Sequence, residues 1–528
     1  MRINLIQLNP IVGNIEKNCD LIISHLEASK GQLCIFPELA LSGYPPEDLL
    51  FHSGIQKRIS NAIDIIKNKT REGVSLILGT PYYEEGKIFN AALYIHNGKI
   101  ESIYKKRSLP NYSVFDEKRY FSEGIEPNFI NHEGVNFALL ICEDFWDDNI
   151  FSKSFSEKTD CIIVINGSPF DCNKIESRRA LAIKRSKDTE LPVIYVNLVG
   201  GQDELIFDGS SFILNSGGEE IIRAKPFEEG SVSFEFSSQN LCKKEEILDI
   251  NNIELIYNAL VLGTRDYIQK NNFSSVLLGL SGGIDSALTL AIACDAIGAE
   301  GVRAVMMPSK FTSNMSVEDA KSQADLLKVK LDVIDISNAM NTFDHTLKDV
   351  FHGYAKDVTE ENIQSRIRGL ILMSLSNKFH SLLLTTGNKS EMAVGYSTLY
   401  GDMAGGFAPI KDCSKTLVYE LARYVNSIAS IIPKRVIERE PSAELAPEQK
   451  DTDSLPPYDV LDPILELFIE HDCSVDQIEK NGFDRNTVIK VLNLVKRNEY
   501  KRRQAPPGVK ITSRAFGKDW RYPITSGY

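Results

Sequence analysis

Residues 277–288 read LLGLSGGIDSAL, and this stretch decides the fold of the second half of the chain. An apolar run typical of a buried strand leads directly into Ser281, Gly282 and Gly283, and a helical pattern begins near Ser286. Adjacent glycines permit a tight turn whose backbone N–H groups point inward, at the positive end of the following helix. The stretch therefore predicts a phosphate-binding turn between a strand and a helix of a parallel sheet.

The side chains of this turn add a cation to the prediction. Ser281 and Ser286 offer hydroxyl donors, whereas Asp285 would repel a phosphate unless a cation lay between them, so we expect Mg²⁺. No lysine follows the glycines, and the spacing is not GxGxxG, so the loops of kinases, GTPases and dinucleotide-binding folds do not fit. The predicted nucleotide contacts are Gly279, Leu280, Ser281, Gly282, Gly283, Ile284, Asp285 and Ser286.

Strands and helices alternate around this turn. Strands are predicted over 275–280, 302–308, 331–336 and 381–388, and helices over 253–269, 286–297, 317–328 and 361–378. This alternation predicts a doubly wound parallel sheet whose ligands bind at the carboxyl ends of the strands.

The first half of the chain has an α/β pattern of its own. Buried strands are predicted over 3–8, 33–38, 74–79, 91–95, 137–142 and 161–165, helices over 18–29 and 55–68, and a hairpin over 211–224. The composition becomes polar and mixed in charge between 228 and 249. We therefore place a domain boundary near residue 245, which gives domains 1–245 and 246–528.

Composition excludes several classes of protein. The 528 residues include 59 Lys and Arg against 72 Asp and Glu, a net charge of −13, so neither nucleic acid nor an anionic membrane is an expected partner. Nine cysteines without a CxxC pair fit neither a disulfide scaffold nor a structural zinc site. The first ten residues resemble a strand rather than a signal peptide, and no apolar run reaches the length of about 18 residues that spans a bilayer. A reducing, cytoplasmic setting is expected.

Three polar residues at predicted strand ends could form a catalytic group. Glu38 ends CIFPE, Cys142 ends LLIC, and Lys106 lies in YKKRSLPNY. Glu38 could take the thiol proton, and Lys106 could stabilise an oxyanion during attack on an amide carbon. Glu143 and Asp144 would raise the pKa of the thiol unless Lys106 offsets them. A cysteine after an apolar strand is also a common inert core residue, so the residues alone leave both readings open.

Three motifs of the first half carry a family resemblance. FPEL, KxxLPNYxVFDExRYF and ICEDFW resemble the carbon-nitrogen hydrolase (nitrilase) superfamily in the version found as a glutaminase, over most of residues 1–235. The resemblance implies an αββα sandwich, with Glu38 as base, Lys106 as stabilising cation and Cys142 as nucleophile. The KxxLP spacing selects Lys106 rather than its neighbour. The resemblance also implies that Glu117 supports the lysine and that the glutamine is held by Tyr112, Ser168 and Lys174.

The second half resembles another family. SGGxDS is similar to the loop of N-type ATP pyrophosphatases, and MPSKFTS, ENIQSRIRG, TTGNKSEMAVGYSTLYGD and YKRRQAPPG resemble NAD⁺ synthetases over most of residues 250–528. The resemblance implies that Thr386 contacts ATP and that Asp285 and Glu391 lie at the metal. It further implies that deamido-NAD⁺ meets Glu391, Asn362, Lys501, Asp402 and Lys411.

Together the resemblances imply two coupled reactions. The first domain would hydrolyse glutamine, and the second would use ATP and Mg²⁺ to amidate deamido-NAD⁺ with the ammonia, releasing AMP and pyrophosphate. An ammonia tunnel and a homo-oligomer are implied in the same way.

Three alternatives stay open. Another ATP-pyrophosphatase amidotransferase shares SGGxDS, although Arg2 excludes the N-terminal cysteine of the asparagine enzymes. A tRNA-modifying enzyme would need a basic face, and Lys501, Arg502 and Arg503 form the one dense basic run. A non-catalytic protein that kept both folds is the third.

Overall fold

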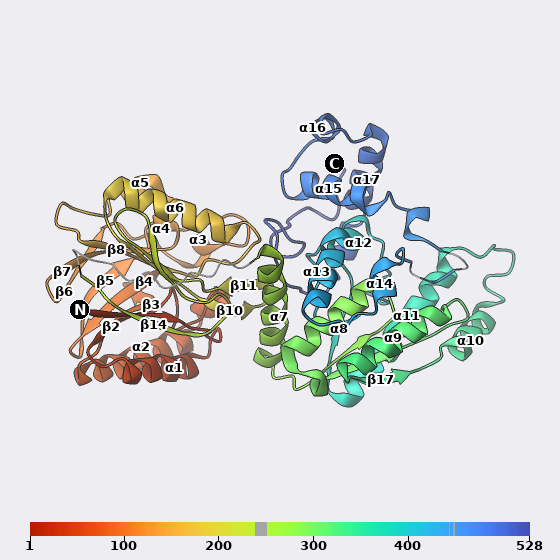
Figure 1. The fold of residues 1–528 in the computed structure, drawn as a ribbon, viewed down its shortest axis with the longest axis horizontal. Helices are drawn as coiled ribbons and strands as arrows, with labels where there is room; N and C mark the ends of the chain where they lie inside the picture. Colours follow the sequence, from red (N-terminus) through yellow and green to blue (C-terminus); the bar gives the residue numbers. More distant parts are fainter. Residues whose placement is uncertain (238–250, 443, 447–448, 528) are drawn as a thin grey trace. The chain divides into compact units, whose positions relative to one another are not determined.

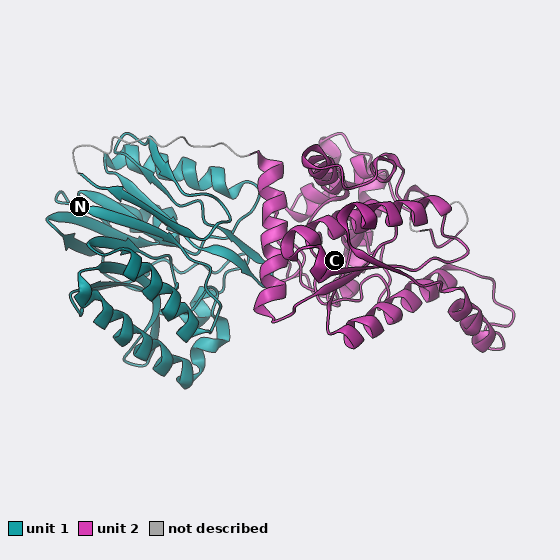
Figure 2. Ribbon diagram, turned by 60° about the horizontal axis from the view of Figure 1, so that its bottom comes forward, with its two compact units in different colours: residues 1–250 teal, residues 251–528 magenta. Residues whose placement is uncertain are grey.

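The chain, in a computed structural model, divides into two compact units, residues 1–250 and 251–528 (Figure 1, Figure 2). The structure describes residues 1–237, 251–442, 444–446 and 449–527. The predicted boundary at residue 245 lies outside these described residues. Each unit has its own sheets and apolar cores.

The first unit contains two six-stranded sheets, in the orders β14-β1-β2-β3-β4-β5 and β13-β12-β9-β8-β7-β6, and a two-stranded ribbon, β10-β11. The strands of the first sheet are β1 (Arg2–Gln7), β2 (Gln32–Ile35), β3 (Ser75–Glu84), β4 (Lys87–His96), β5 (Lys99–Lys105) and β14 (Gly230–Glu235). Those of the second are β6 (Asn128–His132), β7 (Val135–Ile141), β8 (Cys161–Asn166), β9 (Val193–Asn197), β12 (Phe212–Leu214) and β13 (Glu220–Arg223), and the ribbon is β10 (Val199–Gln202) and β11 (Leu205–Asp208).

Helices cover the outer faces of the two sheets. On the first sheet lie α1 (Ile15–Ala28) and α2 (Ser53–Lys69), and on the second lies α6 (Lys174–Thr189) with the short α4 (Glu143–Trp146) and α5 (Asp148–Ser152) (Figure 1). A third apolar core fills the space between the sheets. The predicted αββα sandwich is thus confirmed.

Strand direction brings the first unit's polar strand ends together. β1, β2 and β3 run parallel, as do β7, β8 and β9, so Glu38, Cys142 and Gly167 each follow a parallel strand at its carboxyl end. Gly79 in β3 makes this packing possible, because a Cβ there would lie 2.2 Å from the carbonyl oxygen of Pro37 and 2.7 Å from Cα of Glu38. Glu38 therefore packs against the main chain of β3 at a position without a side chain.

The second unit is built on a four-stranded parallel sheet in the order β17-β16-β15-β18. Its strands are β15 (Val276–Gly279), β16 (Val302–Met306), β17 (Lys330–Val333) and β18 (Leu382–Leu384). In chain order this is 3-2-1-4, the arrangement of a doubly wound sheet, as predicted. The order reverses between β15 and β18, which is where such sheets bind ligands.

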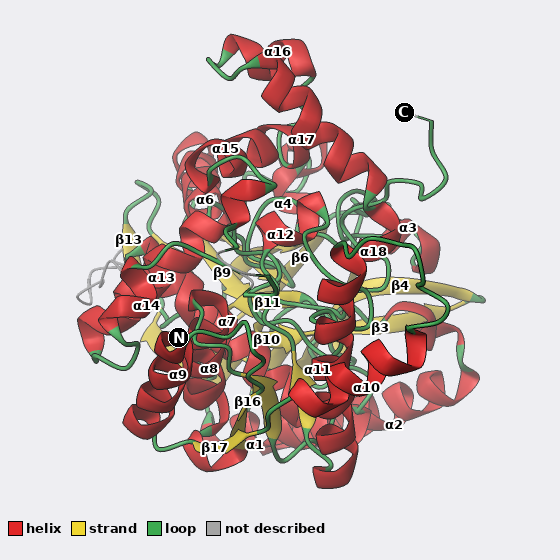
Figure 3. Cartoon of the chain, turned by 90° about the vertical axis from the view of Figure 1, so that its right-hand side faces the viewer, coloured by secondary structure: helices red, strands yellow, loops and turns green. Residues whose placement is uncertain are grey.

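Helices surround this sheet (Figure 3). The core against one face includes side chains of α10 (Ser337–Leu347) and α11 (Val358–Phe379). The helices that follow β15 and β16 are α8 (Ile284–Ile297) and α9 (Asn314–Leu327), and α8 packs with α7 (Asn252–Lys270) and α13 (Lys415–Ile428). Gly298 ends α8, with its N–H bonded to the carbonyl of Cys294 at 2.8 Å.

A second apolar core of this unit joins short helices that the sequence pattern did not predict. It includes α12 (Lys389–Val394), α15 (Tyr458–Ile469), α16 (Val475–Lys480) and α17 (Arg485–Arg497), while α14 (Lys434–Glu438) and α18 (Glu499–Arg502) complete the unit and α3 (Glu117–Tyr120) belongs to the first. Within the described ranges, no helix combines the length and apolarity that crossing a membrane requires.

Candidate active sites

The first site is a fully buried cluster of charge at the strand ends of the first unit. Nζ of Lys106 donates to Oε1 of Glu38 at 2.8 Å and to Oε1 of Glu117 at 2.9 Å. The hydroxyl of Tyr44 donates to the same Glu117 oxygen at 2.9 Å. Lys106 is 1% exposed and Glu38 0%, so these charges interact with little screening by water.

Burial sets the protonation of this cluster. Burial raises the pKa of Glu117 to about 7, against the opposing pull of Lys106. Burial alone would lower the pKa of Lys106, but the carboxylates of Glu117 and Glu38 raise it well above its usual value. Lys106 thus stays an ammonium ion, and its third N–H bond has no acceptor among the described residues.

Cys142 lies at the junction of β7 and α4 with φ 46° and ψ −100°. Its N–H donates to the carbonyl of Ile165 at 3.0 Å and its carbonyl accepts from Phe145 N–H at 3.0 Å, which fixes this strained turn between two parallel strands. Burial raises the pKa of the thiol well above its usual value, and Glu38 and Glu143 add to the rise while Lys106 opposes it. The thiol therefore needs a base beside it to react.

Asp144 does not face the thiol as the sequence suggested. Its Oδ1 accepts the N–H groups of Arg107 at 3.0 Å and Ser108 at 2.7 Å. Its Oδ2 accepts the hydroxyl of Tyr104 at 2.7 Å and the N–H of Ile141 at 3.2 Å. This fully buried carboxylate joins the segment that carries Lys106 to the segment that carries Cys142.

Of the three residues expected to hold glutamine, Tyr112 and Lys174 contact α4, the helix that follows Cys142, and Ser168 follows a residue that bonds Glu38. Tyr112 is half exposed, and its hydroxyl donates to the Glu143 carboxylate at 3.0 Å. Ser168 is buried directly after Gly167, whose N–H bonds Glu38 at 2.6 Å. Lys174 begins α6, and its Nζ lies 4.4 Å from the centre of the Trp146 ring.

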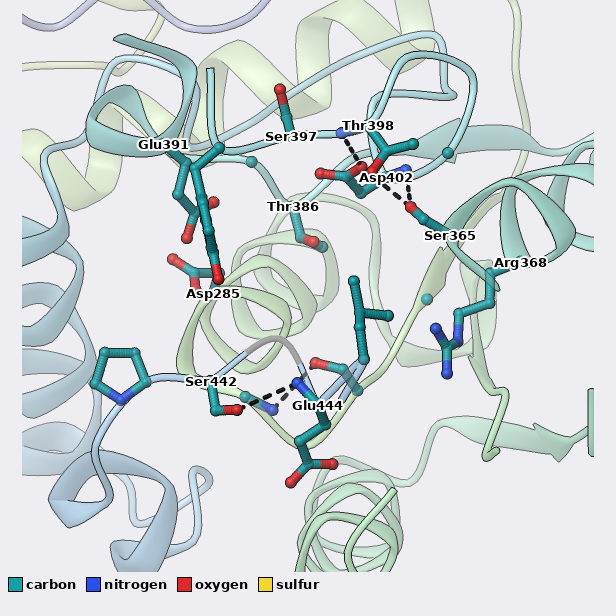
Figure 4. A pocket seen from close by; sticks show the side chains of 18 of the residues that line it. Asp285, Ser365, Arg368, Thr386, Glu391, Ser397, Thr398, Asp402, Ser442 and Glu444 are labelled. Carbon is teal, nitrogen blue, oxygen red and sulfur yellow. Dashed lines mark hydrogen bonds between the residues drawn. The ribbon is translucent and has the colours of Figure 1, made fainter. Parts of the chain in front are cut away.

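The second site is a cavity of about 540 Å³ in the second unit, at the point where the strand order reverses (Figure 4). The turn after β15, the end of β16, the segment after β18 and one side of α11 line it. Of the predicted residues, the lining includes Gly279, Leu280, Ser281, Gly283, Ile284, Asp285, Asn362, Thr386, Glu391, Asp402 and Lys501.

Two residues that were predicted to contact the nucleotide have other roles in the turn. Oγ of Ser286 donates to the carbonyl of Gly283 at 3.0 Å and lies 3.1 Å from Oγ of Ser281, so this hydroxyl closes the turn and does not line the cavity. Gly282 has φ +81°, and a Cβ there would lie 2.3 Å from the carbonyl oxygen of Ser316. Its role in the structure is to let the turn pass the N-terminal end of α9.

Asp285 and Glu391 meet at an ammonium group that the sequence did not indicate. Nζ of Lys415, in the first turn of α13, donates to Oδ2 of Asp285 at 2.6 Å and to Oε1 of Glu391 at 3.0 Å. Nδ2 of Asn388 donates to Oδ1 of Asp285 at 2.8 Å. Burial raises the pKa of Glu391 to about 7, although Lys415 pulls it down.

This pair of carboxylates fits Mg²⁺ bound together with a nucleotide. Within the described ranges there is no group of three or more His, Cys, Asp and Glu residues that could hold a metal ion. Mg²⁺ usually binds through one or two carboxylates plus substrate phosphates, so Asp285 and Glu391 match the chemistry of its ligands. Figure 4 shows both residues on one side of the pocket and Arg368 on the other.

The other end of the cavity is polar and firmly bonded. Oδ1 of Asp402 accepts from Thr398 N–H at 2.7 Å and Ser365 Oγ at 3.2 Å. Nζ of Lys501 donates to the carbonyls of Gly395 and Ser397 at 2.8 and 2.9 Å. Lys411 does not line the main cavity; it lines a neighbouring space of about 10 Å³ that Asp402 shares.

Sequence reasoning also missed a guanidinium in this cavity. Nε of Arg368 donates to the carbonyl of Met307 at 3.1 Å, and burial lowers its pKa to about 10. Its position six residues after Asn362 on α11 was a signal, because both residues lie in ENIQSRIRG. The carboxylate of Glu444 faces the same cavity and accepts from Ser313 and Ser316 at 2.9 and 2.7 Å.

Two family models match the chain: carbon-nitrogen hydrolase over residues 2–241 and NAD synthase over residues 256–505. A glutamine-dependent NAD(+) synthetase of Acinetobacter baylyi is 48% identical to the chain, with 100% of this chain and 98% of that protein covered. The chain belongs to the family of glutamine-dependent NAD(+) synthetases. It is therefore an enzyme that joins a nitrilase-type glutaminase domain to an NAD synthetase domain. A relative of the same name from Aquifex aeolicus is 44% identical, with 100% of both chains covered.

Solved structures agree with this membership. A glutamine-dependent NAD⁺ synthetase of Acinetobacter baumannii in complex with adenosine diphosphate is 44% identical and has a TM-score of 0.81, with 100% of this chain and 98% of that chain covered. A glutamine-dependent NAD(+) synthetase of Cytophaga hutchinsonii has a TM-score of 0.87 over 100% of this chain and 98% of that chain. At 21% identity, the second match bears on the fold alone.

Proposed function

We propose that this chain makes NAD⁺ from deamido-NAD⁺ and ATP with ammonia taken from glutamine, releasing glutamate, AMP and pyrophosphate. The observation that carries the proposal is the presence of both sites in one chain. A buried Glu38, Lys106 and Cys142 cluster lies in the first unit, and a cavity lined by a phosphate-type turn lies in the second. The names of the relatives support the same reaction.

In the first unit Cys142 acts as the nucleophile. Glu38 takes the thiol proton, the thiolate attacks the amide carbon of glutamine, and the remaining N–H of Lys106 stabilises the oxyanion. Glu38 then gives its proton to the leaving nitrogen, and water hydrolyses the thioester with Glu38 again as base. Glu117 serves by holding Lys106 at 2.9 Å, so that the ammonium keeps its place while Glu38 changes charge.

Recognition of glutamine falls to the polar groups around the nucleophile. The Glu143 carboxylate, bonded to Tyr112, suits the α-ammonium group of an amino acid, and Lys174 suits its carboxylate. Ser168 offers a polar contact beside the base. These roles follow from charge complementarity to a zwitterion.

In the second unit the turn after β15 and the first turn of α8 bind the phosphates of ATP through backbone N–H groups. Asp285 and Glu391 would hold Mg²⁺, which when bound neutralises phosphate charge and assists departure of pyrophosphate. Arg368 and Lys415 supply fixed positive charge, and Thr386 contacts the nucleotide. The carboxylate of deamido-NAD⁺ attacks the α-phosphate, and ammonia then displaces AMP from the mixed anhydride.

The dinucleotide substrate is expected along the opposite end of the cavity. Asn362, Asp402 and Lys501 line that end. The hydroxyl of Thr398 donates to Oδ1 of Asn362 at 2.7 Å, and the bonds of Asp402 and Lys501 are those described above. Lys411 borders the adjoining small space and would influence the substrate from there, without lining the main cavity. Movement of ammonia between the units stays a prediction from the family resemblance.

The decisive experiment replaces Cys142 by Ala. Synthesis driven by glutamine should vanish, and synthesis driven by added ammonium should survive at the wild-type rate, with AMP rather than ADP as the nucleotide product. Loss of both activities or of neither would contradict the proposal. Substituting xanthylate or aspartate for deamido-NAD⁺, and a gel shift with tRNA, would reveal the alternative ATP-pyrophosphatase enzymes.

Assembly and location are proposals too. A homo-oligomer is supported by exposed apolar side chains on α11, where Leu370 is 64% exposed and Phe379 41%. Sedimentation at micromolar concentration would test it. A cytoplasmic location is supported by the free cysteines of the described residues.

A further inference from the structure

Asn90 is a buried side chain of the glutaminase site that the reaction above does not use. It lies in the middle of β4 at 0% exposure, and its Nδ2 donates to Oε1 of Glu38 at 2.7 Å. Its main-chain carbonyl accepts the N–H of Lys106 at 2.8 Å. Its own Oδ1 has no hydrogen-bond partner within the described ranges. An unpaired buried acceptor destabilises a fold, and Asn4 shares this feature, so it is the bond to Glu38 that sets Asn90 apart.

The bonds to Glu38 are distributed unevenly over its two oxygens. Oε1 accepts from Lys106 at 2.8 Å and from Asn90 at 2.7 Å. Oε2 accepts from Gly167 N–H at 2.6 Å and, within the described ranges, from no second donor. A carboxylate oxygen has two lone-pair sites. Oε1 is therefore saturated, and the open site of the base lies on Oε2.

We propose that Asn90 is a positioning residue for the glutaminase reaction, which occupies Oε1 of Glu38 so that the proton of the Cys142 thiol is delivered to Oε2. The proposal rests on the proposed function. The thiol S–H bond breaks as Oε2–H forms, and the sulfur electron pair makes the C–S bond. When the C–N bond breaks, the leaving nitrogen takes the proton back from Oε2. Asn90 touches neither thiol nor glutamine and acts only through the base.

A leucine variant isolates the bond from Asn90 to Glu38. Leucine has the same number and branching of side-chain heavy atoms as asparagine and would remove both the donor and the unpaired acceptor. The Asn90→Leu variant should therefore separate catalysis from stability, because it deletes a bond to the base without leaving a polar group unsatisfied.

The test compares Asn90→Leu with Asn4→Leu in the full chain. Asn4 is a matched control, since it is 2% exposed on β1, donates once through Nδ2, to Ser29 at 2.8 Å, and also has an unpartnered Oδ1. We expect the two variants to unfold at similar temperatures. Only Asn90→Leu should lose glutaminase kcat, by roughly 10- to 100-fold, with an unchanged KM for glutamine.

Asn90→Asp provides a readout that a structural role would not move. The introduced carboxyl repels Glu38 when ionised and can donate an O–H to Oε1 when protonated, so the glutaminase activity of this variant relative to wild type should rise as pH falls. Ammonium-driven synthesis, measured on every variant, confirms that the second unit is intact. The proposal is overturned if Asn90→Leu keeps kcat within about two-fold of wild type, or if Asn4→Leu loses as much. Absence of glutamine-driven synthesis in the wild type would instead defeat the proposed function.

Discussion

Asp144→Asn is the substitution that best tests how the glutaminase site is held. Asp144 is 0% exposed and accepts from one hydroxyl and three main-chain N–H groups. Asparagine keeps the size of the side chain but replaces one accepting oxygen by an NH₂ group. The donors on that side, either Arg107 and Ser108 or Tyr104 and Ile141, would then face another donor.

The magnitude follows from the bonds lost. A hydrogen bond to a charged group contributes about 1.5–3 kcal/mol, so losing two costs about 3–6 kcal/mol. For a unit of this size, such a loss should lower the unfolding temperature of the first unit by roughly 10 °C. Because these bonds join the Lys106 segment to the Cys142 segment, glutamine-driven synthesis should fall by more than about 100-fold, whereas ammonium-driven synthesis should keep its rate.

Calorimetry would follow the two unfolding transitions, and release of AMP would follow synthesis with each nitrogen donor. Asp160→Asn is the control, because Asp160 is also a carboxylate that accepts from a main-chain N–H, that of Asn136 at 2.8 Å, away from the cluster. If Asp144→Asn unfolds and turns over glutamine like this control, the view of Asp144 as the link between the two segments is wrong.

Two further predictions concern charge and pH. His132 bonds Tyr94 at 2.9 Å between the sheets, and burial lowers the pKa of its imidazole. Below about pH 6.5 the unfolded chain therefore binds a proton that the folded chain does not. The stability that the neutral His132 contributes is complete above about pH 6.5 and is lost as pH falls below it. Urea midpoints should therefore decline less from pH 7 to 5 in His132→Gln than in the wild type, and parallel curves would refute this. Lys415→Met leaves Asp285 and Glu391 without their cation, at a cost of about 3–5 kcal/mol. It should raise the pKa of Glu391 further and lower ammonium-driven synthesis by at least about 100-fold with a higher Mg²⁺ requirement, and an unchanged Mg²⁺ titration would contradict it.

Much of the fold follows from local pattern. Apolar runs such as 161–165 are β-strands because both their faces are covered, and they appear as β8 and its neighbours. The strand, turn and helix around residue 281 could be predicted because adjacent glycines allow the tight turn and Gly283 is the N-cap of the helix. The helices α15, α16 and α17 were not predicted, because their apolar faces are buried only when they pack on one another in a separate core.

The residues of the candidate sites also differ in how far the sequence predicts them. Residues at strand ends, such as Glu38 and Cys142, can be proposed from sequence because parallel strands place their ends together. Lys415 could not, because the start of an ordinary helix carries no sign of the two carboxylates that it meets, which lie 130 and 24 residues upstream. Asn90 carried a weak signal, since it is the one polar residue in the run FNAALYI. Asp144 carried a misleading one, since three of its four partners lie on another segment.

The left-handed backbone at Cys142 has a consequence for chemical labelling. An isolated segment would abandon φ 46° at a non-glycine residue, so the turn exists only while β7 and β8 hold it. The accessibility of the Cys142 thiol to an alkylating reagent should consequently change abruptly when β7 and β8 separate. Alkylation of Cys142 would thus report whether the first unit is folded.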